Sequence, residues 1–187
     1  KNLQDVTAQA HGLATAFLPG RLQYVPGGDG LPPLLLDGAH NPHGMAALVA
    51  ALRNADLHPA GAVFSCLGDK DWQPALHLLK DCLGNAPLFI PTLRNERAAP
   101  AAVIAAAANS CGPATAQALP DGPEALSQAL SRAAALPEVG PRRPVLLAGS
   151  LYLLAEFYAL RPQWLNPPTS AACRPDIFAA SPVQPTP

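Results

Sequence analysis

Apolar runs of strand length alternate with amphipathic segments along most of the chain. Residues 3–17 place apolar side chains at helical spacing and predict a helix, which Pro19-Gly20 would end. Beyond it, each short apolar run is followed by a segment with helical periodicity. The predicted strands are residues 21–25, 33–37, 62–67, 88–90, 114–119 and 145–148, and the predicted helices are 42–54, 72–83, 98–110, 124–136 and 151–160.

This alternation predicts an α/β fold. Strands separated by helical crossovers form a parallel sheet with helices on both faces. Only the turn cluster 26–30 separates the first two strands, so these should form a hairpin with one antiparallel edge strand. We therefore expect a Rossmann-like, mostly parallel sheet of about six strands. Asp121-Gly122-Pro123-Glu124 is expected to cap the helix that follows it.

Composition fits one domain with a sizeable core. The chain has 187 residues, of which 49% are hydrophobic and 13% charged. A net charge of −1, with no basic run longer than Arg142-Arg143, argues against nucleic acid as the main partner. No apolar stretch is long enough to cross a membrane, and no signal peptide is recognisable.

Cysteine and proline usage adds two expectations. The four cysteines form no C-x-x-C pair, which indicates reduced thiols in a cytoplasmic protein. Residues 166–187 are rich in proline and predict a flexible tail, with a short anchor at Ile177-Phe178.

The candidate chemistry centres on residues 34–43. Leu34-Leu35-Leu36 reads as a buried strand that ends at Asp37-Gly38, and Asn41 with Pro42 can begin a helix. The unpaired N–H groups and positive dipole end of a helix N-terminus suit an anion such as phosphate. Polar groups also follow two other predicted strands, at Gly68-Asp69-Lys70-Asp71 and at Gly149-Ser150. In a parallel sheet all three junctions would lie at the carboxyl edge, which predicts a ligand site there.

The residues alone leave the role of each group open. Asp37 could be a turn residue, His40 a structural histidine, Asp69 and Asp71 solvated turn charges, and Ser150 an ordinary helix cap. The chain contains no Walker A loop, no G-x-G-x-x-G and no G-x-S-x-G. His40 and His43 have no third ligand at metal-site spacing, so we expect no metal site. These residues support a small-molecule, anion-binding α/β domain.

Four segments carry a closer resemblance, in this order: Pro19–Gln23 (PGRLQ), Asp37–His43 (DGAHNPH), Gly68–Asp71 (GDKD) and Val145–Tyr152 (VLLAGSLY). Together they resemble the C-terminal domain of bacterial folylpolyglutamate synthase/dihydrofolate synthase, a branch of the Mur ligase superfamily. The resemblance covers residues 1–160. It implies that residues 1–20 end a linker to an N-terminal ATPase domain and that 21–165 form a Mur ligase C-terminal-like domain, before the tail 166–187.

The resemblance implies an ATP-dependent acid–amino-acid ligase. In this family ATP phosphorylates a carboxylate of dihydropteroate or folate, and L-glutamate attacks the acyl phosphate. The P-loop and the Mg²⁺ ligands belong to the N-terminal domain, and the C-terminal domain closes over ATP and presents glutamate. We expect a monomer that acts with its own N-terminal domain and is inactive alone, because the chain has no P-loop.

The resemblance also suggests residue roles. Arg21 matches an arginine that reaches the nucleotide phosphates, and a guanidinium suits developing phosphoryl charge. Asp37 matches an acid on the ribose side of ATP. His40 matches the histidine near the acyl phosphate and is the expected catalytic residue, while Asn41 fixes the junction of the nucleotide site. The glutamate-side residues are Lys70 with its neighbours Asp69 and Asp71, and Ser150; Arg97 matches a family arginine without an assigned role.

Two departures and two alternatives accompany the resemblance. Leu18 stands where relatives often have tryptophan, and the loop 26–32 is a few residues longer, which should not alter strand register. The alternatives are the C-terminal domain of another Mur-type ligase and a non-catalytic Rossmann-like binding module. The intact residues 37–42 argue against the first, and the start at Lys1, within a predicted helix, argues against the second.

Overall fold

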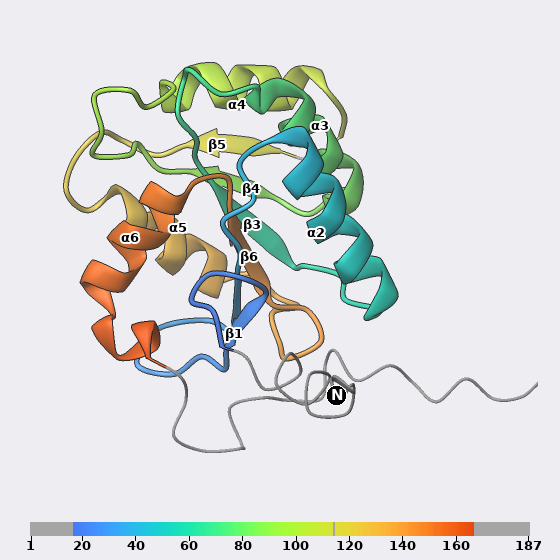
Figure 1. Ribbon diagram of the computed structural model, residues 1–187, viewed down its shortest axis with the longest axis vertical. Coiled ribbons are helices and arrows are strands. Elements are labelled where there is room, and N and C mark those ends of the chain that lie inside the picture. Colours follow the sequence, from blue (N-terminus) through green and yellow to red (C-terminus); the bar gives the residue numbers. More distant parts are fainter. Residues whose placement is uncertain (1–16, 114, 167–187) are drawn as a thin grey trace, which may run out of the picture.

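Six strands form one mixed sheet in the order β1-β2-β6-β3-β4-β5 (Figure 1). The structure is a computed structural model that describes residues 17–113 and 115–166. The strands are β1 Gln23–Val25, β2 Leu34–Leu36, β3 Gly61–Phe64, β4 Leu88–Ile90, β5 Ala116–Ala118 and β6 Val145–Ala148. β1 pairs with β2 antiparallel, and every other pairing is parallel. The predicted sheet, with its single antiparallel edge strand, is confirmed.

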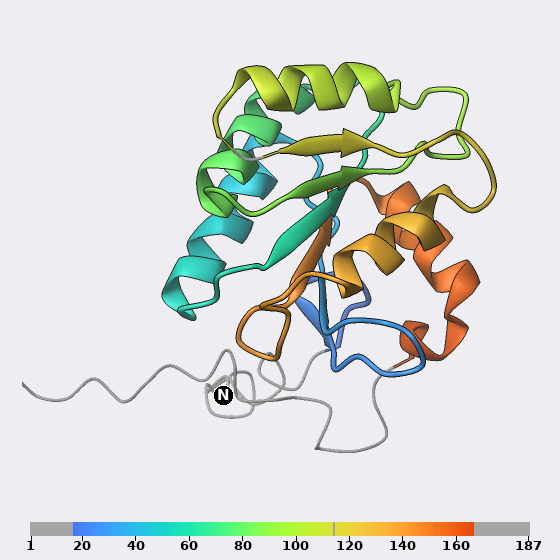
Figure 2. The same cartoon turned by 180° about the vertical axis from the view of Figure 1, so that it is seen from behind.

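Helices cover both faces of the sheet, as expected. They are α2 Pro42–Asn54, α3 Trp72–Leu83, α4 Ala101–Ser110, α5 Ala125–Ala134 and α6 Leu151–Leu160, followed by the 3₁₀ helix η1 Pro162–Leu165. α2, α3 and α4 pack on one face, and α5 and α6 on the other, as Figures 1 and 2 show from opposite sides. None of the helices in the described ranges is both long and apolar enough to cross a membrane.

Strand residues alternate between the two layers of the core. In β2, Leu35 joins the layer under α2, α3 and α4, while Leu34 and Leu36 join the layer under α5 and α6. All three side chains are fully buried. Full burial of a leucine stabilises a fold by about 1.5–3 kcal/mol, so this run of three fixes β2 against both layers of the core.

Several local predictions differ from the structure. The helix predicted from residue 98 begins at Ala101, because Ala98 pairs with Leu67 and the Ala99 N–H donates to the Cys66 carbonyl. The expected cap at residues 121–124 is wrong, since no side chain caps α5 and Asp121 instead accepts a hydrogen bond from the Thr92 hydroxyl. The predicted helix over 3–17 and the tail with its anchor at Ile177-Phe178 lie outside the described residues, apart from Phe17 and Asn166.

Candidate functional site

The turns that follow β2, β6 and β3 meet at the carboxyl edge of the sheet. These three strands are neighbours and run parallel, so their carboxyl ends lie together. The Gly149 N–H, after β6, donates a hydrogen bond of 2.9 Å to the carbonyl of Ala39, after β2. The predicted convergence of the three junctions is therefore confirmed.

The loop before β1 joins the same edge because β1 runs in the opposite direction. Its Gly20 carbonyl accepts a hydrogen bond of 2.8 Å from the Gly38 N–H. The Arg21 guanidinium lies directly against Gly38, where a Cβ would clash with Nη1 of Arg21 and come within 2.5 Å of Leu151. The side chains of Arg21 and of α6 thus occupy the space that a side chain at position 38 would need.

A cavity of about 350 Å³ opens between this loop and the start of α2. We call it the Arg21 pocket; its lining includes Arg21, Asp37, Gly38, His40, Asn41 and His43. Asn41 caps α2, with its side-chain oxygen accepting from the Gly44 N–H at 2.8 Å, and Pro42 occupies the first turn. The capping that the sequence predicted for this helix is confirmed, and it orients the helix N-terminus toward the pocket.

Asp37 is a buried carboxylate, 8% exposed, that holds two loops together. Its Oδ2 accepts from the Leu22 N–H at 2.9 Å, and its Oδ1 accepts from the Ala39 N–H at 2.8 Å. Hydrogen bonds to an ionised acceptor are roughly twice as strong as neutral ones. Asp37 thus fixes the Arg21 loop against the β2–α2 turn, a structural role that the sequence left open.

His40 lies where two cavities meet. Its Nδ1 is 2.8 Å from the Gly38 carbonyl, which can only accept, so Nδ1 carries the proton of this bond. In the neutral ring Nε2 is then the acceptor nitrogen, and it has no hydrogen-bond partner among the described residues. His40 lines both the Arg21 pocket and the neighbouring cavity.

The second cavity, of about 230 Å³, lies beside the start of α6. We call it the Ser150 pocket; its lining includes His40, Lys70, Arg97, Gly149, Ser150 and Tyr152. Ser150 is 3% exposed and caps α6, with Oγ accepting from the Tyr152 N–H at 3.0 Å. Lys70 and Arg97 bring two cationic side chains to one small cavity.

Arg97, which lines the Ser150 pocket, forms an ion pair with Asp69. The hydrogen bond from Arg97 lowers the pKa of the Asp69 carboxyl, and the charges of Arg97 and Lys70 add to the effect. Both side chains are about half exposed, so the pair is screened and contributes little to stability. Its significance is that it fixes the direction of the Arg97 guanidinium.

The structure separates the sequence-predicted residues into two groups. It brings Arg21, Asp37, His40 and Asn41 around one pocket and Lys70 and Ser150 around the other. Asp71 lines neither; it is exposed and precedes α3 without a side-chain capping bond.

Sequence reasoning gave Arg97 no role and did not single out Tyr152. Arg97 reaches the site because the chain after β4 folds back onto the β3–α3 loop, where the Arg97 carbonyl accepts a hydrogen bond of 2.7 Å from the Gly68 N–H.

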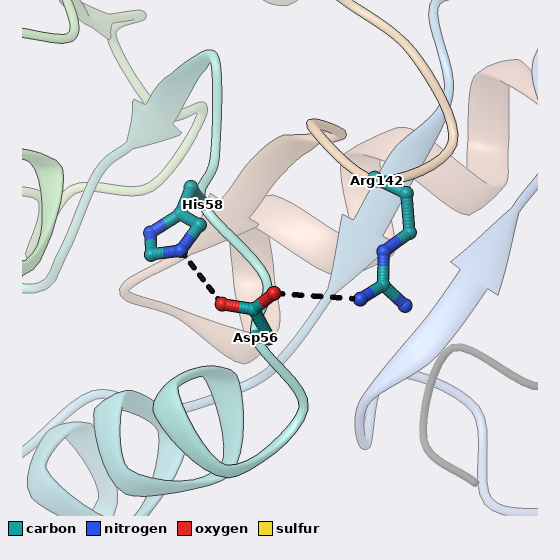
Figure 3. Close-up of polar contacts among 3 residues, drawn as sticks. All are labelled: Asp56, His58 and Arg142. Carbon is teal, nitrogen blue, oxygen red and sulfur yellow. Dashed lines mark hydrogen bonds and ion pairs between the residues drawn. The ribbon is translucent and has the colours of Figure 1, made fainter. Parts of the chain in front are cut away.

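Another polar cluster lies at the opposite, amino edge of the sheet (Figure 3). Asp56 contacts His58 at 3.1 Å and Arg142 at 3.7 Å. All three side chains are mostly exposed, and exposed pairs of this kind contribute about 0–1 kcal/mol. No group of three or more His, Cys, Asp or Glu side chains suited to a metal ion occurs in the described part of the chain.

The family model for the Mur ligase, glutamate ligase domain, matches residues 20–151. The chain belongs to this Mur ligase family. The match begins at the Arg21 loop and ends in the first turn of α6, so it includes every residue that lines the two pockets except Tyr152. The family that the sequence motifs suggested is confirmed.

Individual members of the Mur ligase family are similar to this chain in sequence and in structure. The chain is 31% identical over 142 residues to the folylpolyglutamate synthase of Lacticaseibacillus casei, covering 76% of this chain and 29% of that protein. The structure of Mycobacterium tuberculosis folylpolyglutamate synthase, complexed with ADP and AMPPCP, superposes with a TM-score of 0.66 at 26% identity. That match covers 89% of this chain and 37% of the other.

A Yersinia pestis bifunctional folylpolyglutamate synthase/dihydrofolate synthase, with Mn, AMPPNP and L-glutamate bound, has a TM-score of 0.64 at 29% identity. The match covers 87% of this chain and 36% of that one. The chain therefore spans about a third of the length of these relatives, and it corresponds to their Mur ligase C-terminal domain.

Proposed function

We propose that this chain is the C-terminal domain of an ATP-dependent ligase that adds L-glutamate to dihydropteroate or folates through an acyl phosphate. One observation carries the proposal: the Arg21 pocket and the Ser150 pocket meet at His40. A ligase of this kind must bring a nucleotide phosphate and an amino-acid acceptor to one reacting carboxylate. Two anion-suited pockets that share one histidine fit that requirement.

The Arg21 pocket is the proposed nucleotide side. Arg21 supplies a permanent positive charge, and the capped N-terminus of α2 adds oriented N–H groups. These donors stabilise the negative charge on a phosphoryl group during its transfer, and they do so without losing a proton. Asp37 sets the geometry of this side through its two backbone bonds, and we assign it the ribose side of ATP. Asn41 holds the helix start in place.

His40 is the proposed catalytic residue at the meeting point of the pockets. Its Nδ1–H bond to the Gly38 carbonyl orients the ring and leaves Nε2 to act on a ligand. A neutral Nε2 can accept the proton of an attacking amine, and a protonated one can donate to a phosphate oxygen. Either role requires the reacting carboxylate to lie between the two pockets.

The Ser150 pocket is the proposed glutamate side. Lys70 and Arg97 line it and offer charge partners for the carboxylates of L-glutamate, and the turn at Gly149 and Ser150 closes one wall. Arg97 recognises carboxylates well because its donors form a planar fork. Asp71 belongs to the same loop, and we give it at most an indirect part because it lines neither cavity.

We further propose that Mg²⁺ and most of the ATP are held by an N-terminal domain that carries the P-loop. The support is that the Yersinia pestis relative binds Mn and AMPPNP and that this chain covers 36% of it. A bound divalent ion would add positive charge to that of Arg21 in balancing the charge of the phosphates. We infer that the whole protein is a monomeric, cytoplasmic ligase that uses ATP, L-glutamate and dihydropteroate or folate.

The test is a nuclear magnetic resonance titration of this chain with ADP and, separately, with L-glutamate. We expect ADP to shift the amide signals of residues 20–22 and 38–44, and L-glutamate to shift those of residues 68–70, 97 and 149–152. Arg21→Ala should weaken ADP binding about tenfold, the loss of one charge-assisted contact. Arg142→Ala, which removes an arginine at the amino edge, is the matched control and should have no effect.

Two results would contradict the proposal. One is equal ADP affinity for the Arg21→Ala and Arg142→Ala variants. The other is release of phosphate when the unmodified chain alone is mixed with ATP, dihydropteroate and L-glutamate, because the proposal places the P-loop in another domain.

A further inference from the structure

Gln23 is a buried polar side chain that no role in the site yet explains. It lies in β1 and is 6% exposed. Its Oε1 accepts from the Gly20 N–H at 2.9 Å and from the Tyr158 hydroxyl at 2.6 Å. Its Nε2 donates to the Trp164 carbonyl at 2.6 Å. A buried carboxamide with three partners from separate elements costs free energy to desolvate, so its bonds specify one arrangement.

The loop that Gln23 contacts has an unfavourable backbone conformation. Gly20 has φ of +66° and Leu22 has φ of +44°. Glycine adopts this left-handed region freely, whereas the side chain of Leu22 makes it cost about 1–2 kcal/mol. Such a loop keeps its shape only if neighbouring groups hold it. Asp37 holds the Leu22 N–H and Gly38 holds the Gly20 carbonyl, at 2.9 and 2.8 Å. Gln23 holds the Gly20 N–H, and the Arg21 N–H bonds within the loop to the Leu18 carbonyl at 3.1 Å.

Arg21 lies between these three anchors. Its side chain is exposed and long, so the direction of its guanidinium depends on the backbone of residues 20–22. Nη1 of Arg21 donates a hydrogen bond of 3.3 Å to the Gly20 carbonyl. The N–H of the same residue, Gly20, donates to Gln23. A change at Gly20 would therefore move both the backbone and the guanidinium contact.

Tyr158 makes the arrangement depend on α6. Burial raises the pKa of the Tyr158 hydroxyl to about 12, so it remains a donor throughout the physiological range. Cβ at Gly20 would approach the Tyr158 hydroxyl to 3.3 Å, which shows how closely the loop packs on α6. The other end of this helix begins at Ser150 in the second pocket. α6 thus contacts both the Arg21 loop and the Ser150 pocket.

We propose that Gln23, held by Tyr158 and Trp164, is a positioning residue that sets the orientation of Arg21. Gln23 does not touch a ligand; it acts by fixing Gly20. The functional value of this role rests on the proposed function, in which Arg21 contacts nucleotide phosphates. The physical claim, that Arg21 is ordered through Gln23, can be tested without any ligand.

The experiment compares Tyr158→Phe and Gln23→Met with Tyr24→Phe as the matched control. Tyr24 is also partly buried, lies next to Gln23 in β1, and packs against the opposite core layer. No side-chain hydrogen bond of Tyr24 occurs among the described residues. We would measure hydrogen exchange of the Gly20 amide, ¹⁵N relaxation of the Arg21 Nε–H group, and thermal unfolding of each variant.

Removal of the network should accelerate Gly20 exchange by about fivefold or more and increase the motion of the Arg21 side chain, as expected for one or two lost hydrogen bonds. Tyr24→Phe should change neither. ADP affinity should fall about 3–10-fold in Tyr158→Phe, with a melting temperature close to that of Tyr24→Phe.

Equal Gly20 exchange and equal Arg21 motion in Tyr158→Phe and Tyr24→Phe would overturn the inference. So would faster exchange with unaltered Arg21 motion, because Gln23 would then serve only the fold. Arg21→Ala separates the two proposals: if it leaves ADP binding unchanged, the nucleotide assignment fails, whereas the ligand-free measurements still decide whether Gln23 orders Arg21.

Discussion

At the scale of single residues, polar groups in this domain act mainly through hydrogen bonds to backbone atoms. Both oxygens of Asp37 and the side-chain oxygen of Asn41 accept from N–H groups of their own or neighbouring turns. A turn whose N–H groups are already satisfied is rigid, and rigid turns present nearby charges in a fixed direction. Arg21 and His40 each lie beside such a turn, so their side chains are held in a fixed direction.

The Asp69–Arg97 pair gives a prediction of pH dependence. Because Arg97 lowers the pKa of Asp69, the carboxylate should titrate with a midpoint below the value of about 3.9 for an unperturbed aspartate. The pair is therefore intact above that value and is lost as the pH falls through the lowered pKa. Side-chain carboxyl signals followed from pH 2 to pH 6 would measure it.

Arg97→Ala is the informative variant for this titration, and it should move the Asp69 midpoint up toward the unperturbed value. Arg94→Ala is the control, since the Arg94 guanidinium donates to the Pro123 carbonyl instead of a carboxylate. An identical Asp69 midpoint in both variants would show that Arg97 is not the cause.

At the scale of secondary-structure elements, the sequence predicted what depends on local pattern. The six strands and the α-helices α2 to α6 were anticipated, because apolar spacing reports which side of an element faces the core, whereas the 3₁₀ helix η1 was not predicted. The cap expected at residues 121–124 is wrong because Asp121 forms its hydrogen bond with the distant Thr92. β5 is shorter than predicted, three residues of Ala-Gln-Ala, since alanine has little preference for strands.

The candidate site was predictable only in part, for the same reason. Asp37 and His40 were candidates from the strand-to-helix pattern, whereas Arg21 and the role of each residue came from a resemblance; the sheet topology then explains why they meet. Gln23 was missed and Arg97 was noted without a role, because their partners are distant in sequence: Tyr158 is 135 positions from Gln23, and Asp69 is 28 from Arg97. No local pattern encodes such contacts.

The α2 cap yields a prediction at this scale. Asn41→Ala removes the acceptor for the Gly44 N–H and should lower the free energy of unfolding by about 1 kcal/mol. It should also weaken ADP binding if the helix start contacts phosphate. Urea denaturation gives the first quantity and the ADP titration gives the second.

Asn54→Ala is the control for the cap, because Asn54 is the last residue of α2 and is exposed. Should Asn41→Ala and Asn54→Ala be equally stable, the cap would contribute nothing that can be measured.

At the scale of the whole molecule, the two edges of the sheet differ in the groups that they carry. The carboxyl edge holds both pockets, whereas the amino edge holds the β1–β2 connection and the exposed Asp56 cluster (Figure 3). The pairing of Gln23 with Leu36 and Val25 with Leu34 is regular despite the long 26–32 loop, as the sequence led us to expect.

This division predicts that the amino edge tolerates added residues. Insertion of Gly-Ser between Gly28 and Asp29 should lower the free energy of unfolding by about 1 kcal/mol or less, because loop closure depends weakly on length. The ADP-induced shifts at residues 38–44 should be unchanged. The same insertion between Ala39 and His40 should abolish them, and retained shifts there would contradict the assignment of the carboxyl edge.

The reversed direction of β1 also has a mechanical consequence. The chain enters the described fold at Leu18 and Pro19, and the Arg21 loop follows immediately at the carboxyl edge. Tension applied to the chain ahead of Phe17 would therefore reach this loop before any strand. The first bonds to bear that tension would be the one between the Leu18 carbonyl and the Arg21 N–H and then those of Gly20 to Gln23 and Gly38, rather than those between parallel strands. A force-extension measurement pulling at this end should thus release the Arg21 loop before the sheet separates.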